Sequence, residues 1–194
     1  MARSSARRRR PGSERDAAPT LPAAPGPASG LSLSTVTAPR VWQGIGYRPL
    51  PAPDAARFLF DFAAIAWPEG GVMFGWGAFA AGEGSPERLI GALVVEVAAE
   101  AALLHGPVVV EGDDRLEIAA QLVAATLDHA TALSAQTIFS RPQGLDRIWV
   151  RFGFIPVPEG TLPSALAGAP ATGLYAWRGG SALWTLREAA RNSV

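Results

Sequence analysis

The sequence contains no cysteine, no lysine and only two histidines, His105 and His129. Without cysteine the chain has no disulfide, no thiolate metal site and no cysteine nucleophile. Two histidines are too few for the usual histidine-based zinc ligand sets, so we expect no metal. No apolar run reaches the roughly 20 residues that a membrane helix requires. We therefore expect a soluble, cytoplasmic protein with no membrane span.

The zero net charge conceals two parts of opposite charge. Residues 1–40 carry seven arginines against two acids, a net charge of +5. Residues 41–194 carry ten arginines against 15 acids, a net charge of −5. The 194 residues, of which 48% are hydrophobic, suffice for one domain with a buried core. The composition thus predicts a basic tail followed by an acidic domain.

We predict that residues 1–34 form a disordered tail rich in arginine, proline and alanine, and that residues 35–194 form the single domain. Arg7 to Arg10 are four adjacent arginines, and local positive charge attracts nucleic acid or an acidic surface. A weak contact of this kind is one interpretation of the tail. A solvated tail without a partner, or a mis-assigned start codon, is the other.

Hydrophobic periodicity and turn residues predict a series of alternating elements after the tail. The predicted strands cover residues 41–50, 72–80, 88–97, 101–110, 136–140, 154–157 and 174–178. The predicted helices cover residues 54–67, 113–133, 145–152 and 181–191, the last being a C-terminal helix. This order predicts an α/β (α+β) fold with a mixed, mostly antiparallel central sheet flanked by helices. Gly106-Pro107 stands in the middle of a strand, and we expect that strand to be bent or bulged there.

The segment from Leu103 to Phe154 runs strand, acidic turn, apolar helix, strand and short helix, and it closes on Gly153-Phe154. This order, and the order of elements from residue 41 onward, resembles the GCN5-related N-acetyltransferase (GNAT) fold. In that family an R/Q-x-x-G-x-G/A loop holds the coenzyme A pyrophosphate at a helix N-terminus, where backbone N–H groups and the helix dipole favour an anion. The corresponding residues here run from Arg115 to Ala120, of which the first and last match the pattern.

The resemblance implies acetyl-CoA as cosubstrate and a set of residues that contact it: Val108, Val110, Arg115, Ala119, Ala120 and Trp149. Two departures from the family pattern stand in this set. Ile118 replaces the first glycine of the loop, and Trp149 stands where the family carries a tyrosine that acts as general acid. Asp113, Asp114 and Glu117 also place carboxylates in the first helical turn, where they repel a pyrophosphate.

A general base in this family is a glutamate or histidine on the central strands, and the candidates here are Glu96, Glu100, His105 and Glu111. Of these we predict Glu96, Glu111 and His105 as catalytic residues. The leading prediction is an acetyl-CoA-dependent N-acyltransferase that transfers an acyl group directly to an amine on a small molecule or peptide. The alternative is a degenerate GNAT-fold binding or assembly module without turnover. Neither the amine nor the oligomeric state is indicated by the sequence, and a homodimer is left open.

Overall fold

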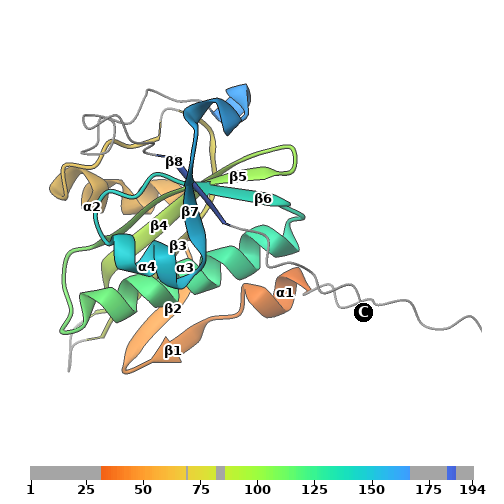
Figure 1. Ribbon diagram of the computed structural model, residues 1–194. Helices are drawn as coiled ribbons and strands as arrows, with labels where there is room; N and C mark the ends of the chain where they lie inside the picture. The colour runs from red at the N-terminus through yellow and green to blue at the C-terminus, as the bar shows by residue number, and fades with distance from the viewer. Residues whose placement is uncertain (1–31, 69, 82–85, 167–182, 187–194) are drawn as a thin grey trace, which may run out of the picture.

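The computed structural model describes residues 32–68, 70–81, 86–166 and 183–186. In this part of the chain eight strands form one sheet in the order β1-β2-β3-β4-β5-β6-β8-β7 (Figure 1). The strands are β1 Arg40–Trp42, β2 Ile45–Pro49, β3 Val72–Ala80, β4 Arg88–Ala98, β5 Ala101–Val109, β6 Thr137–Ser140, β7 Phe154–Val157 and β8 Leu183–Leu186. The helices are α1 Leu33–Val36, η1 Pro53–Ala56, α2 Arg57–Phe62, α3 Arg115–Ala132, α4 Asp146–Arg151, η2 Glu159–Thr161 and η3 Ser164–Leu166, where η marks a 3-10 helix.

Every neighbouring pair of strands is antiparallel except β5 and β6, which are parallel. Parallel neighbours need a long crossover connection, and the 18-residue helix α3 provides it between these two strands. The predicted mixed, mostly antiparallel sheet flanked by helices is therefore confirmed. The one parallel pair lies in the middle of the sheet, where the candidate site is found.

Helices cover both faces of the sheet (Figure 1). On one face, Leu122 of α3 and Trp149 of α4 belong to the same buried cluster as Leu104 of β5. On the opposite face, Phe60 of α2 packs in a second cluster with Val94 of β4. Burying one large apolar side chain contributes about 1.5–3 kcal/mol, so these two layers supply the main stabilisation of the domain.

The first predicted strand, residues 41–50, is a hairpin of two strands. Gln43 and Gly44 connect β1 to β2, and both have positive φ angles, 48° and 76°. Two-residue hairpin turns of the mirror-image type require positive φ at both positions, which Gly44 adopts without strain. Helix α1, Leu33–Val36, precedes this hairpin and has Ser32 as its N-cap.

Two predicted helices differ from the observed elements. The helix predicted at residues 54–67 is the 3-10 turn η1 followed by α2, which ends at Phe62. The helix predicted at residues 181–191 is wrong for the described residues 183–186, which form β8 between β6 and β7. Leu183 and Trp184 are buried there, and pairing on both sides overrides the local helical preference. The predicted strand at 174–178 and tail residues 1–31 lie outside the described residues.

Among the helices of the described segments, none combines the length and the apolar character needed to cross a membrane.

Candidate active site

Strand β5 is longer than its parallel neighbour β6. The two strands pair from Ala101 with Thr137 to Leu104 with Ser140, where β6 ends, while β5 continues to Val109. On its other side β5 remains paired with β4, and the N–H of Val110 donates to the carbonyl of Ile90 at 2.9 Å. Because backbone groups alternate in direction along a strand, the N–H and C=O of Val109 point to the open side. Residues 105–109 thus line a gap in the sheet. The backbone N–H of Val110 points away from this gap, towards β4.

A bulge in β5 marks the start of this gap. The register with β4 shifts between Ala92 and Val94, opposite Gly106 and Pro107. Gly106 has a φ of +96°, and a Cβ atom on it would lie 3.0 Å from the nitrogen of Val108 and 3.1 Å from the carbonyl oxygen of Ala92. Only glycine fits this conformation and this close approach of two strands. The bend predicted from Gly106-Pro107 is confirmed.

Two of the three predicted bases meet beside this bulge. Nε2 of His105 lies 2.7 Å from Oε2 of Glu96, within hydrogen-bond distance. Both side chains are on the face of the sheet that α2 covers, because they alternate with residues packed against α3. Glu96 is buried, and its Oε1 atom lies where a Cβ atom of residue 70, two residues before β3, would stand. The buried carboxylate thus lies within hydrogen-bond distance of the imidazole ring on the same face of the sheet.

The third predicted base is not part of this pair. Glu111 follows β5 on an exposed loop, and its carboxylate forms an ion pair with Arg88 at the start of β4. An exposed pair of this kind leaves the carboxylate solvated and its geometry loosely defined. Of the three predicted bases, only Glu96 and His105 thus lie next to each other.

On the other face of the sheet, three buried polar side-chain atoms have no hydrogen-bond partner within the described residues. They are the hydroxyl of Tyr47 on β2, Oγ of Ser140, at the last residue of β6, and Nε1 of Trp149, on α4. A buried polar group without a partner costs about 1–3 kcal/mol. Such atoms occur where a ligand or water completes the hydrogen bond. Trp149 was predicted as a contact residue, whereas a serine that ends an apolar strand gives no signal in the sequence.

At the start of α3, carboxylates of the protein itself already pair with a backbone N–H group and with an arginine. The carboxylate of Asp114 accepts a hydrogen bond from the backbone N–H of Glu117 at 3.0 Å. The carboxylate of Glu117 in turn accepts from Arg151 at 3.2 Å and from Gln121 at 2.8 Å. A hollow of about 240 Å³ between α3 and α4 is lined by two acids and two arginines, the second arginine being Arg147. Its formal charge is zero.

The remaining predicted loop contacts lie apart from this hollow. Ala119 and Ala120 face the sheet as part of the buried core, whereas Arg115 is exposed at the first position of α3. Ile118 is buried, and its Cδ1 atom occupies the space in which a Cβ atom of residue 112 would lie. The residues of the gap fit the neutral, amide-containing pantetheine arm of coenzyme A. Those of the helix start do not fit its pyrophosphate.

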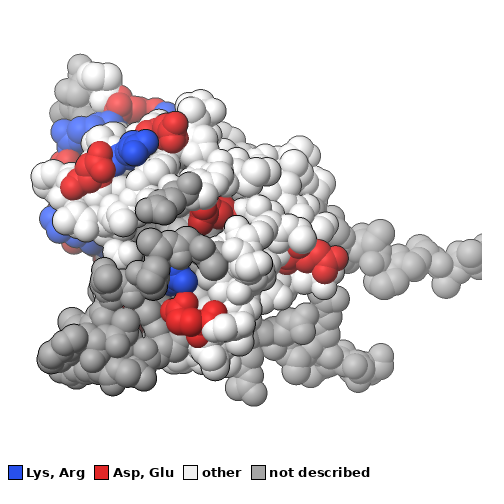
Figure 2. All heavy atoms as spheres, turned by 90° about the horizontal axis from the view of Figure 1, so that it is seen from above, with Lys and Arg blue, Asp and Glu red and all other residues white. Residues whose placement is uncertain are grey.

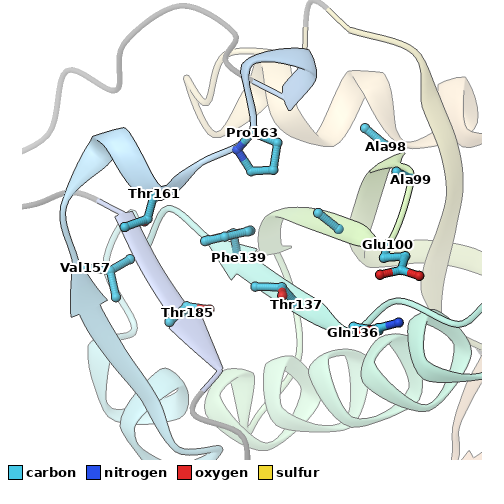
Figure 3. A pocket seen from close by; sticks show the side chains of 11 residues that line it. Ala98, Ala99, Glu100, Gln136, Thr137, Phe139, Val157, Thr161, Pro163 and Thr185 are labelled. Carbon is cyan, nitrogen blue, oxygen red and sulfur yellow. The ribbon is translucent and has the colours of Figure 1, made fainter.

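A larger cavity of about 530 Å³ lies at the hairpin between β4 and β5, and we call it the hairpin cavity (Figure 3). Ala98, Phe139 and Pro163 supply apolar walls, and the Glu100 carboxylate lies on one side of it. The cavity is on the same face of the sheet as His105. Leu103, which is fully buried, separates the two along β5.

Two titratable side chains on the α3 face are held neutral. Burial, together with the negative charge of Glu117, raises the pKa of Tyr47 to about 12. Burial lowers the pKa of His129, whose Nδ1 accepts a hydrogen bond from Nε1 of Trp76 at 3.2 Å. Both residues are part of the packing against α3. They lie away from the Glu96–His105 pair, which occupies the other face.

The surface charges are mixed. On the face that Figure 2 shows, arginines and acids of the described segments lie next to one another at one side, and uncharged residues occupy most of the remainder. Among the described residues, ion pairs such as Arg48 with Glu87 and Arg141 with Glu159 also bring opposite charges together. The described residues on that face therefore present no extended basic surface.

A scan of the sequence against protein-family models finds no match, and a search of curated proteins finds none either. Solved structures do match. A GNAT-family acetyltransferase from Staphylococcus aureus Mu50 aligns with a TM-score of 0.50 and 11% identity, covering 72% of this chain and 97% of that one. Two structures of N-acetylglutamate synthase from Neisseria gonorrhoeae align with TM-scores of 0.50 and 0.52 at 13% and 15% identity.

One synthase structure is complexed with coenzyme A and L-arginine, and the other with coenzyme A and N-acetyl-glutamate. The alignments cover 74% and 76% of this chain but only 33% and 36% of the synthase chains, so this protein spans about a third of their length. The chain has the GNAT fold, in a divergent form.

Proposed function

We propose that this protein is an acetyl-CoA-dependent N-acyltransferase in which Glu96 and His105 act together as the general base. The observation that carries the proposal is the position of this pair, 2.7 Å apart, with His105 directly after the last residue of β5 that pairs with β6. A buried carboxylate that orients an imidazole is a common arrangement for moving a proton near neutral pH. The GNAT fold of the chain supports a thioester as the acyl donor.

Each member of the pair has a distinct task. When Nε2–H of His105 donates to the Glu96 carboxylate, Nδ1 of the ring carries the lone pair and accepts a proton from the attacking amine. Glu96 then stabilises the imidazolium that forms, because its negative charge lies at hydrogen-bond distance. His105 is therefore the group that removes the proton, and Glu96 is a positioning residue.

The reaction that follows is a direct transfer. The amine nitrogen attacks the thioester carbonyl carbon, a C–N bond forms, the C–S bond breaks, and the sulfur leaves as a thiolate that takes up one proton. The donor reaches the gap from the α3–α4 face, where Ser140 and Trp149 offer unused hydrogen-bonding atoms. The acceptor, a small-molecule or peptide amine, approaches from the opposite face, which carries the pair and the hairpin cavity.

The test is acyl transfer from acetyl-CoA to a panel of amino acids, polyamines and short peptides, followed by release of free thiol. Glu96→Gln and His105→Gln are expected to lower kcat by about 100-fold or more while leaving the fold intact. Glu111→Gln is the matched control, since it also removes a carboxylate near β5, and its activity is expected to be unchanged. Full activity in His105→Gln would discard the proposed base.

A second function is favoured by one observation, the neutral and self-capped start of α3. This arrangement suits a GNAT-fold binding module that no longer turns over. Calorimetry with acetyl-CoA separates the two functions. Binding without transfer to any amine of the panel supports the module, and no binding at millimolar acetyl-CoA contradicts the enzyme.

A further inference from the structure

We propose that the site recognises its acyl donor through the pantetheine thioester alone, so that the nucleotide half of coenzyme A contributes little to binding. The donor class is then any acyl-pantetheine thioester, with or without a nucleotide. This inference rests on the proposed function, because it concerns the donor of the same reaction. Four features of the described residues support it.

The first is the occupied anion position at the start of α3. A helix N-terminus binds phosphate through backbone N–H groups that have no partner within the helix. Here the N–H of Glu117 already donates to the carboxylate of Asp114 at 3.0 Å. A pyrophosphate would have to displace a covalently attached anion from the same donor, and it would gain little by doing so.

The second feature is steric. A phosphate must approach the backbone closely, which is the reason that glycine suits such loops. Ile118 fills the space beside Gly112 with its Cδ1 atom, and its side chain is 3% exposed. The space beside the turn before α3 is therefore filled by the apolar side chain of Ile118.

The third feature is charge. Arg147 and Arg151 are the cations beside the hollow between α3 and α4, and Asp114 and Glu117 cancel them. Arg151 is already engaged with Glu117 at 3.2 Å. The charged residues that flank the hollow in the sequence, Asp113, Arg115 and Asp146, add two negative charges and one positive charge. A diphosphate meets no net positive potential here.

The fourth feature is that the gap suits the other half of the donor. Pantetheine is uncharged and contains two amides, which need hydrogen-bond donors and acceptors arranged along an extended chain. Val109 presents its backbone N–H and C=O to the gap, and the atoms Ser140 Oγ and Trp149 Nε1 are buried without partners among the described residues. Ser140 Oγ, at the end of β6 where the gap begins, therefore lacks a partner among the described residues, whereas the N–H of Glu117 at the helix start already has one.

The experiment compares two pairs of ligands on the full chain. Calorimetry is performed with coenzyme A and with pantetheine, and transfer is followed with acetyl-CoA and with S-acetylpantetheine. We expect the two dissociation constants to agree within about threefold, and likewise the two values of kcat/KM. A preference for the nucleotide-containing ligand of about 30-fold or more would overturn the inference, since charge-assisted phosphate contacts give differences of that size.

A variant provides the converse test. Asp114→Ser keeps a good N-cap while removing its charge, and Glu117→Gln releases Arg151. The double variant is expected to bind coenzyme A about tenfold more tightly relative to pantetheine than the native protein does. Asp61→Asn, which removes an exposed acid on α2 at the other face, is the control and should leave the ratio unchanged. An unaltered ratio in the double variant would contradict the assignment of these carboxylates.

Failure of the inference and failure of the proposed function give different results. Equal binding of coenzyme A and pantetheine without transfer to any amine supports the inference and contradicts the enzyme. Transfer that strongly prefers acetyl-CoA supports the enzyme and contradicts the inference. No binding of either ligand contradicts both.

Discussion

The Oε1 atom of Glu96 occupies the space in which a Cβ atom of residue 70 would lie, so Gly70 and Glu96 fit together only because residue 70 has no side chain. Gly70→Ala is expected to push the carboxylate away from its position beside His105. The end of a flexible side chain moves at small energetic cost, and the free energy of unfolding should therefore change little. Acyl transfer should fall, by about tenfold or more.

The neighbouring glycine provides the control for this experiment. A Cβ atom on Gly71 meets no heavy atom within 4 Å, so Gly71→Ala should leave both activity and stability unchanged. Steady-state kinetics and urea denaturation of the two variants make the comparison. Equal activity of the two would show that the position of the Glu96 carboxylate does not matter.

Ser140→Ala is expected to affect stability and donor binding in opposite directions. The Ser140 hydroxyl is fully buried without a partner in the described structure, and its removal should raise the free energy of unfolding by up to about 1 kcal/mol. If the hydroxyl contacts the donor, the same change weakens pantetheine binding. Chemical denaturation and calorimetry measure the two effects, and a loss of stability without a loss of affinity would assign Ser140 a purely structural role.

Gly106→Ala tests the bulge. A side chain at a φ of +96°, 3.1 Å from the Ala92 carbonyl oxygen, should lower the free energy of unfolding by about 1–3 kcal/mol. His105 precedes this residue, so the variant should also lose activity. Gly46→Ala, also on a strand of this sheet, has only one contact, at 3.9 Å, and is the control for a glycine replaced without strain.

The pH dependence of stability should carry a contribution from His129. Burial lowers its pKa in the folded protein below the usual value of 6.5, so the unfolded chain binds the proton more readily. Its contribution to stability is complete above pH 6.5 and is lost as the pH falls through that value towards the folded pKa. Urea midpoints between pH 5 and pH 8 should decline at the acidic end, and the decline should be smaller in His129→Gln. An equal decline in both proteins would remove His129 as its source.

The central part of the fold was predictable, because α3 and the strands on either side of it are long and strongly periodic. Strand β8 was not, since a four-residue strand with two buried residues gives the same local pattern as a turn of helix. Its placement depends on β6 and β7, which flank it in the sheet. Pairing between strands that are distant in the sequence cannot be read from the local pattern of apolar residues in β8.

For the site, the sequence predicts Glu96 and His105 as separate candidate bases and does not predict that they contact each other. Glu96 and His105 were each predicted as a base, and their contact depends on the register of β4 and β5, in which Val94 lies opposite His105. The bulge sets that register. Asp114 was recognised as an acid at the helix start, while its hydrogen bond to Glu117 and the unpartnered hydroxyl of Ser140 required the structure.

The bulge at Gly106 and Pro107 has a consequence for solubility as well. An uncovered strand edge is a template on which another chain can add a strand, which is a common route to aggregation. Proline has no backbone N–H to offer, and the bent backbone at Gly106 breaks the regular spacing that an added strand would need. The bulge therefore also makes the part of β5 beyond Leu104 a poor template for pairing with another copy of the protein.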